Sequence, residues 1–89
     1  MQFEGAHITE QGVTFGIISV KPHVLNNPND QTGMRAFGTQ VFGRVPIVLM
    51  AQDSRGVATF QGRPDLVRFL ARIDLSRIPW KKYTVSQAA

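Results

Sequence analysis

The chain lacks cysteine altogether, and this absence excludes disulfide bonds, thiolate ligands for metals and catalysis by a thiol. Long hydrophobic runs are missing too, because the longest, Ile47 to Ala51, is far shorter than the roughly 20 residues that a bilayer-spanning helix requires. Residues 1–5 do not begin with the basic and then apolar stretch of an export signal. We therefore expect a cytoplasmic protein with no membrane partner.

Charged residues are also few, at 18% of the 89 positions, whereas hydrophobic residues supply 43%. These proportions are those of an ordinary globular chain, and its length suffices for one hydrophobic core. We predict a single domain over residues 1–89, with a loose C-terminal end at 86–89. A core this small leaves little net stability, so a homo-oligomer is also considered.

Acidic residues number 6 against 10 for lysine and arginine, and the whole excess of +4 lies in the second half of the chain. Residues 1–44 hold three cations and three carboxylates, whereas residues 45–89 hold seven cations and three carboxylates. A cationic surface attracts acidic proteins and nucleic acid over long distances. Charge of this size also serves solubility alone, so it does not choose a partner by itself.

Alternating apolar residues in the first quarter of the chain indicate a β-hairpin. Phe3 and Ile8 precede the turn residues 10–12, and the segment Val13–Val20 is rich in β-branched and aromatic residues. Gly12 can supply the positive φ that a short hairpin loop requires. We therefore expect two antiparallel strands here.

A first helix is expected to begin near Pro28, because the polar loop 26–30 supplies an N-cap. Apolar residues then recur at helical spacing at Met34, Phe37 and Val41. Gly43 is placed to end this helix in a left-handed conformation. Gly33 and Gly38 each cost about 1 kcal/mol relative to alanine inside a helix. Either a close packing contact requires these glycines, or the helix is shorter than the segment from Pro28 to Gly43.

The continuously apolar stretch Val45–Ala51 predicts a central strand that is covered on both faces. Turn residues at 53–56 lead into an extended segment at Val57–Gln61, so a second hairpin is expected. Pro64 suits the first turn of a following helix. The apolar stripe of that helix comprises Leu66, Phe69, Leu70 and Ile73.

After one further turn at 75–79, the segment Trp80–Val85 is extended chain or an edge strand. Two hairpins, each followed by a helix, give the order ββαββα. We predict an α+β fold of two layers, a four-stranded sheet with both helices on one face.

The second half also carries a resemblance. Val45-Pro46 before an apolar strand, Asp53-x-x-Gly56, a second strand, Gly62 and an amphipathic helix are similar to the C-terminal ββα half of thioredoxin-like proteins. The resemblance covers about half of the chain and implies that Pro46 is cis and lines a groove for substrate peptide. The family's Cys-x-x-Cys is replaced by Lys21-Pro22-His23-Val24, so the resemblance implies no disulfide exchange.

Recognised catalytic and metal-binding patterns are absent from the sequence. His7 and His23 are the only imidazoles and have no acidic cluster nearby, so no metal site and no cofactor are predicted. No serine stands in a Gly-x-Ser-x-Gly elbow, and the glycines match no phosphate-binding loop. The enzymatic alternative is acid–base chemistry centred on His23, close to Lys21, and His7 near Glu4 is a second pairing of the same kind.

Cations alternate with aromatic residues toward the C-terminus. The candidate binding residues are Arg68, Arg72, Arg77, Trp80, Lys81, Lys82 and Tyr83. Because arginine and aromatic side chains commonly anchor protein interfaces, the first hypothesis is a small non-catalytic module that binds a protein or peptide at the sheet edge and this surface. The alternative is nucleic-acid binding, in which the cations contact phosphates and the rings stack on bases. Trp80 also suits a purely structural role as an anchor on the core.

Overall fold

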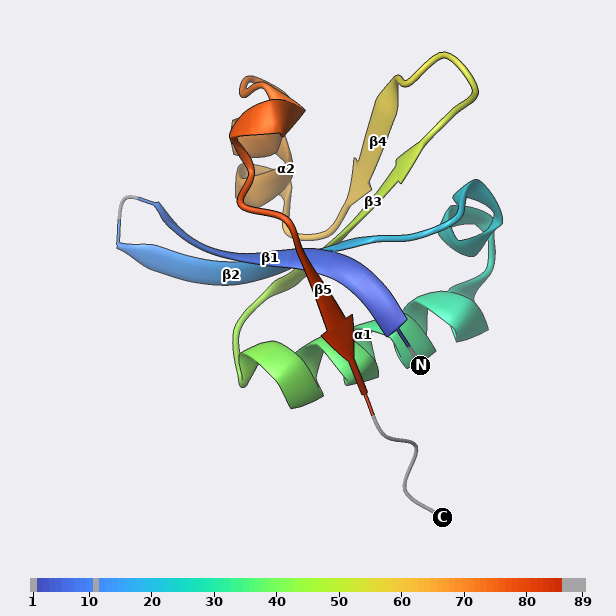
Figure 1. Cartoon of the computed structure of the whole chain (residues 1–89), viewed down its shortest axis with the longest axis vertical. Helices are drawn as coiled ribbons and strands as arrows, with labels where there is room; N and C mark the ends of the chain where they lie inside the picture. Colours follow the sequence, from blue (N-terminus) through green and yellow to red (C-terminus); the bar gives the residue numbers. More distant parts are fainter. Residues whose placement is uncertain (1, 11, 86–89) are drawn as a thin grey trace.

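Five strands form one mixed sheet in the computed structural model, which describes residues 2–10 and 12–85 (Figure 1). The strands are β1 (Gln2–Glu10), β2 (Val13–Ser19), β3 (Ile47–Gln52), β4 (Ala58–Gln61) and β5 (Lys81–Thr84), in the spatial order β4-β3-β2-β1-β5. The helices are α1 (Pro28–Phe42) and α2 (Pro64–Leu70), with short 3-10 turns η1 (Pro22–Asn26) and η2 (Leu75–Arg77). The predicted loose end at 86–89 lies outside the described residues.

Both predicted hairpins are present. β1 pairs antiparallel with β2 from Glu4↔Ser19 to Glu10↔Val13, and Gly12 has the expected positive φ of 79°. β3 and β4 form the second hairpin, whose turn is closed by hydrogen bonds to Asp53. These local pairings follow from turn chemistry that the sequence displays.

Helix α1 connects β2 to β3, which therefore pair in parallel. Its start is the predicted one, because Asn27 Oδ1 accepts hydrogen bonds from the amides of Asn29 and Asp30 at 3.0 and 3.2 Å, and Pro28 occupies the first turn. It also ends at Gly43 as predicted, with a positive φ of 85°, but the ψ of −162° differs from that of the left-handed helical conformation expected there. The helix thus keeps its full length despite its internal glycines.

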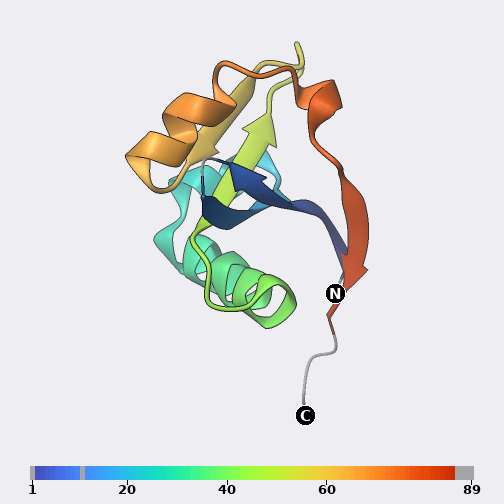
Figure 2. The ribbon, with the colours of Figure 1, turned by 90° about the vertical axis from the view of Figure 1, so that its left-hand side faces the viewer.

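The two helices lie on opposite faces of the sheet, as Figure 2 shows, so the prediction of both helices on one face is wrong. Adjacent residues of the central strands face different helices: Ile17 and Val48 pack with α2, whereas Ile18 and Leu49 pack with α1. All four side chains are fully buried. A strand that is apolar at every position requires a cover on each side, and two helices on one face would leave half of these side chains in water.

The prediction of four strands is also wrong, because Lys81–Thr84 forms a fifth strand, β5, against β1. This pairing runs from Gln2↔Thr84 to Gly5↔Lys81 and joins the two ends of the described chain. The element order is therefore ββαββαβ, and the extended segment predicted after residue 79 is confirmed as an edge strand.

Helix α2 packs through the predicted stripe. Leu66 and Leu70 are buried, and Phe69 and Ile73 are half-buried against the same core. The helix proper ends at Leu70, so Ile73 reaches the core from the turn that follows. Within residues 2–10 and 12–85, neither helix has the length and apolar character needed to cross a bilayer.

Pro46 stands at the start of β3 and is half-buried. Its peptide bond is trans, so the cis bond expected from the resemblance to thioredoxin-like proteins is not present. The Pro46 carbonyl accepts a hydrogen bond from the Gly16 amide at 2.9 Å, which begins the parallel ladder between β2 and β3. Pro46 therefore lies two strands away from the edge formed by β1.

Arg35 ties α1 to the second hairpin. Its half-buried guanidinium donates to the carbonyl of Ile47 and, at 2.9 Å, to Oε1 of Gln61, and burial lowers its pKa. Gln61 in turn donates to Gln31 on α1 at 2.8 Å. These bonds fix α1 across the ends of β3 and β4, where hydrogen bonding offsets the cost of burying polar groups.

The glycines of the hairpin and of α1 give a test of this packing. A Cβ added at Gly16 would lie 2.8 Å from Phe42 Cγ, whereas a Cβ at Gly33 would meet nothing within 4 Å. We expect Gly16→Ala to lower the free energy of unfolding by about 1–3 kcal/mol through overpacking. Gly33→Ala should raise it by about 0.5–1 kcal/mol, because alanine favours a helix interior. Urea denaturation measures both, and a stable Gly16→Ala protein would contradict the seating of Phe42 on β2.

Candidate functional site

The outer edge of β1 is only half covered. β5 pairs with residues 2–5, and the chain before it turns away, since the Trp80 amide bonds back to the Ile78 carbonyl at 2.8 Å. The remainder of β1 projects beyond β5 toward the hairpin tip (Figure 1). The residues His7 to Glu10 therefore form an open strand edge.

The backbone groups on this edge can be assigned from the ladder. In an antiparallel pair, alternate residues bond to the partner strand and the others face away. The Gly16 amide bonds to Pro46 on the β3 side, so its partner His7 does not bond to β2. The N–H and C=O groups of His7 and Thr9 consequently face outward, and no backbone hydrogen bond joins either to a loop in residues 2–10 and 12–85.

A groove of about 360 Å³ runs beside this edge on the α2 side. Its apolar wall comprises Phe69 and Ile73, together with Ile78 and Pro79 from the chain that leads into β5. A smaller hollow of about 140 Å³ continues it along the hairpin and shares Glu10 and Phe69 with it. The open edge thus lies against an apolar surface, which is what an added strand with alternating side chains requires.

Two opposite charges line the same groove. Glu10 is the last residue of β1, and Arg77 belongs to η2. Both side chains are exposed, and neither forms an ion pair with a described residue, since the salt bridges of residues 2–10 and 12–85 join Arg63 to Asp65 and His23 to Asp30. Arg77 acts electrostatically on Asp74 and helps to lower the pKa of that carboxyl, but the two form no ion pair, so both Arg77 and Glu10 can still meet a ligand.

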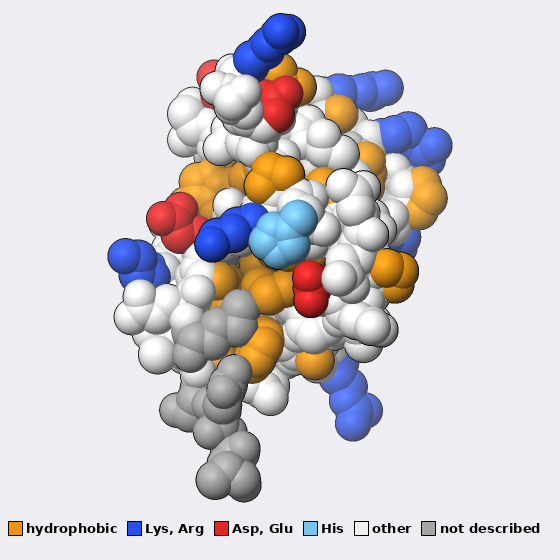
Figure 3. Space-filling model, turned by 90° about the vertical axis from the view of Figure 1, so that its right-hand side faces the viewer, with side chains coloured by type: hydrophobic (Ala, Val, Ile, Leu, Met, Phe, Trp, Pro, Cys, Tyr) orange, Lys and Arg blue, Asp and Glu red, His pale blue; other side chains and the backbone are white. Residues whose placement is uncertain are grey.

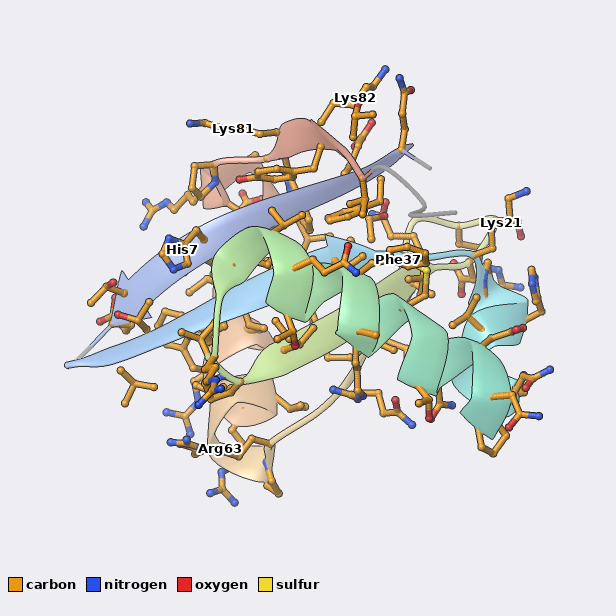
Figure 4. The ribbon with its side chains drawn as sticks, turned by 90° about the horizontal axis from the view of Figure 1, so that it is seen from below. His7, Lys21, Phe37, Arg63, Lys81 and Lys82 are labelled. Atoms are coloured by element: carbon orange, nitrogen blue, oxygen red, sulfur yellow. The ribbon has the colours of Figure 1, made fainter. Side chains whose placement is uncertain are left out.

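The imidazole of His7 lies on the other face of β1. It stacks on Phe42 of α1 with ring centroids 5.7 Å apart and an interplanar angle of 21°. Figure 4 shows His7 near the end of α1. Side chains alternate between the two faces of a strand, and Glu10 is three residues after His7 in β1. The Glu10 side chain therefore faces the α2 side, and it does not form an acid–base pair with His7.

The predicted cluster of cations and aromatic residues is divided by the sheet. Trp80 is half-buried on the α2 side, where its indole N–H donates to the Leu75 carbonyl at 3.2 Å. Tyr83 is half-buried on the α1 side, stacked on Phe3 at 5.5 Å and edge-on to Phe42 at 5.1 Å. The two rings therefore anchor different cores and do not form one stacking surface.

The predicted cations are all exposed: Arg68, Arg72, Arg77, Lys81 and Lys82. Arg77 alone among them lines the groove. Lys81 and Lys82 extend from β5 away from the sheet, on the opposite side of the molecule from Arg63 (Figure 4). Of the predicted binding residues, the structure thus brings Arg77 to the open edge and leaves Trp80 and Tyr83 as anchors of the adjoining strand.

His23, the centre of the enzymatic hypothesis, lies in η1. Its Nε2 is 4.0 Å from Asp30 Oδ2, and the side chains are 68% and 46% exposed. It borders a hollow of about 320 Å³ with Met34 and Phe37, on the side shown in Figure 3, where apolar side chains are exposed beside an imidazole. Solvent screens a contact this exposed, and it is an ion pair only when the imidazole is protonated, so it is a weak surface interaction.

The part of the site formed by His7 to Glu10 was not predicted from the sequence, since backbone groups carry no residue signature. One signal was present: the first strand is long, whereas the final extended segment is short and preceded by Pro79. A short strand beside a long one leaves part of the longer edge free.

Hydrogen exchange tests the open edge residue by residue. The amides of Ala6 and Ile8 should exchange slowly because they bond to β2, and those of Phe3 and Gly5 because they bond to β5. The amides of His7 and Thr9 should exchange fast. Uniform protection across residues 6–9 in an NMR exchange experiment would contradict the assignment.

The pair at the start of α2 gives a pH-dependent test. The hydrogen bond from Arg63 lowers the pKa of Asp65 from 3.8 to about 2. Since the folded state lowers this pKa, the pair stabilises the folded protein fully at a pH above 3.8, the pKa of the carboxyl in the unfolded chain. This stabilisation is lost as the pH falls through about 2. Arg63→Ala should move the pKa of Asp65 up toward 3.8, as measured by NMR titration of its carboxyl carbon. Arg68→Ala, further along α2, should leave it near 2; equal effects would rule out the pairing.

Comparisons of the chain with protein-family models, with curated proteins and with solved structures found no match. The resemblance to thioredoxin-like proteins therefore stays a prediction. Among the described residues, no group of three or more histidine, cysteine or acidic side chains lies close enough to hold a metal ion.

Proposed function

We propose that the protein is a non-catalytic binding module that accepts an extended peptide segment of a partner protein as an added strand on β1. The observation that carries the proposal is the outward-facing, unpaired backbone of His7 and Thr9 beside an apolar groove. Such an edge offers two donors and two acceptors in strand geometry, and backbone pairing of this kind supplies affinity in strand-addition complexes. The peptide would continue the line of β5.

The groove supports this occupant by its shape and lining. In a strand added to β1, every second side chain points to the α2 face. There it would meet Ile8, Phe69 and Ile73, which are only half-buried in the free protein. A groove of about 360 Å³ accommodates a large apolar side chain and parts of its neighbours. The apolar contact would give the site selectivity as well as affinity.

Nucleic-acid binding is the second candidate, favoured by the exposure of Arg68, Arg72, Lys81 and Lys82. Single-stranded binders combine such cations with aromatic faces that stack on bases. Here Trp80 and Tyr83 are partly buried on opposite faces of the sheet, which removes the stacking surface expected from the sequence. We therefore favour the binding of a peptide over the binding of nucleic acid.

Thr9 allows the strand edge to be blocked without breaking the fold. Thr9→Pro removes an N–H that faces outward, so the β1–β2 ladder is kept. Thr9→Val is the matched control, because both variants lose the 2.8 Å hydrogen bond between the hydroxyls of Thr9 and Thr14. A peptide selected on the wild type from a random display library should bind Thr9→Pro about tenfold more weakly and Thr9→Val nearly as well. Fluorescence anisotropy measures both affinities.

Equal binding to the two variants, or a library that yields no binder, would overturn the proposal. If Thr9→Pro does not fold, NMR mapping on the wild type decides: the bound peptide must slow exchange of the His7 and Thr9 amides. The nucleic-acid alternative would instead show oligonucleotide binding at low salt that weakens steeply as ionic strength rises.

A further inference from the structure

Resting on the proposed function, we propose that the preferred peptide carries an apolar residue between a basic and an acidic residue, the basic one meeting Glu10 and the acidic one meeting Arg77. Both charged side chains line the groove, and neither is paired with a described residue. A groove with one free charge of each sign is complementary to a segment that presents the opposite signs in a fixed order.

The two charges mark different ends of the open edge. Glu10 pairs with Val13 at the hairpin turn, so it stands at the far end of β1. Arg77 is two residues before Pro79, close to the point where the chain joins β1 as β5. The apolar wall made by Phe69 and Ile73 belongs to the same groove. The site therefore combines an acidic group, an apolar wall and a basic group along one strand edge.

Strand geometry sets the spacing at the acidic end. Glu10 and Ile8 share a face of β1 because they are two residues apart. Peptide residues opposite them also share that face, so the basic residue should stand two positions from the apolar one. β5 runs antiparallel to β1, and a peptide that continues its line in that direction has its basic residue N-terminal to the apolar one.

Other charged groups near the groove do not compete for these roles. Asp65 is held by Arg63, and Asp74 Oδ1 accepts the amide of Ser76 at 3.0 Å. Both carboxyls have lowered pKa values, chiefly because of these hydrogen bonds, and the charge of Arg77 also lowers that of Asp74. They are already satisfied within the fold, which leaves Glu10 as the carboxylate free to receive a partner's cation.

Four labelled peptides provide the probe. They share an apolar residue flanked by neutral residues, and carry a lysine two positions before it, a glutamate as the last residue after it, both, or glutamine at each place. The peptide with both charges should bind the wild type most tightly, with each charge contributing about threefold at low salt. The advantage should vanish at 1 M salt, where the screening length is about 3 Å.

Single neutral variants assign each charge to its partner. Glu10→Gln should abolish the gain from the peptide lysine and leave the gain from glutamate unchanged, and Arg77→Gln should do the reverse. Arg68→Gln is the matched control, since Arg68 is exposed on α2 and does not line the groove. Gains that survive in Glu10→Gln and Arg77→Gln would overturn the inference.

The outcomes separate this inference from the proposed function. If all four peptides bind equally and lose affinity on Thr9→Pro, the strand site stands and its charge preference is wrong. If none binds and the display library also yields nothing, both fail. If sedimentation shows self-association that Thr9→Pro abolishes, the occupant is a second copy of the chain, and the charged-peptide inference is wrong.

Discussion

The parallel pairing of β2 with β3 is the constraint on which the rest of the structure depends. Both strands are buried on both faces, and Ile17, Ile18, Val48 and Leu49 have no exposed surface. Burying each such side chain contributes roughly 1.5–3 kcal/mol, so neither face can be left open. Parallel strands need a crossover, which α1 supplies on one face, and α2 must then cover the other. Three layers therefore result, with α1 and α2 on opposite faces of the sheet.

This arrangement also decides where function can be located. With β2 and β3 in the centre, the outer positions fall to β4 on one side and to β1 with β5 on the other. β5 is short and pairs with four of the nine residues of β1. α2 and η2 pack on the same side as the uncovered part and convert a bare strand edge into a walled groove. The candidate site is therefore a consequence of the way in which α2 and η2 cover the core on this face of the sheet.

Local features were predictable from the sequence because they depend on neighbouring residues. The hairpin at Gly12, the cap at Asn27 and the stripe of α2 all reflect chemistry within a few positions. The extended segment after residue 79 was predictable, but its pairing with β1 as a fifth strand was not, since that depends on the distant residues Gln2 and Thr84. The prediction that both helices lie on one face of the sheet was wrong for a different reason. The apolar residues Ile47 to Ala51 of β3 already demanded a cover on each face, but α1 carries Gly33 and Gly38 and has too weak an apolar stripe to reveal which face it covers. Of the candidate site, Arg77 was predictable as an exposed cation, whereas backbone atoms on a strand edge leave no mark in the sequence.

Gly38 gives a structural reason for the weak apolar stripe of α1. A side chain there would press on Ile18 and Ile47, so the glycine lets the helix settle close to the sheet. The pairing of Gln2 with Thr84 has a consequence of another kind. During synthesis β1 is made long before β5, so the whole outer edge of the β1–β2 hairpin is unpaired until residues 81–84 have been added. The mature protein keeps the distal half of that early state, because the chain before Lys81 turns away from β1 instead of extending along it.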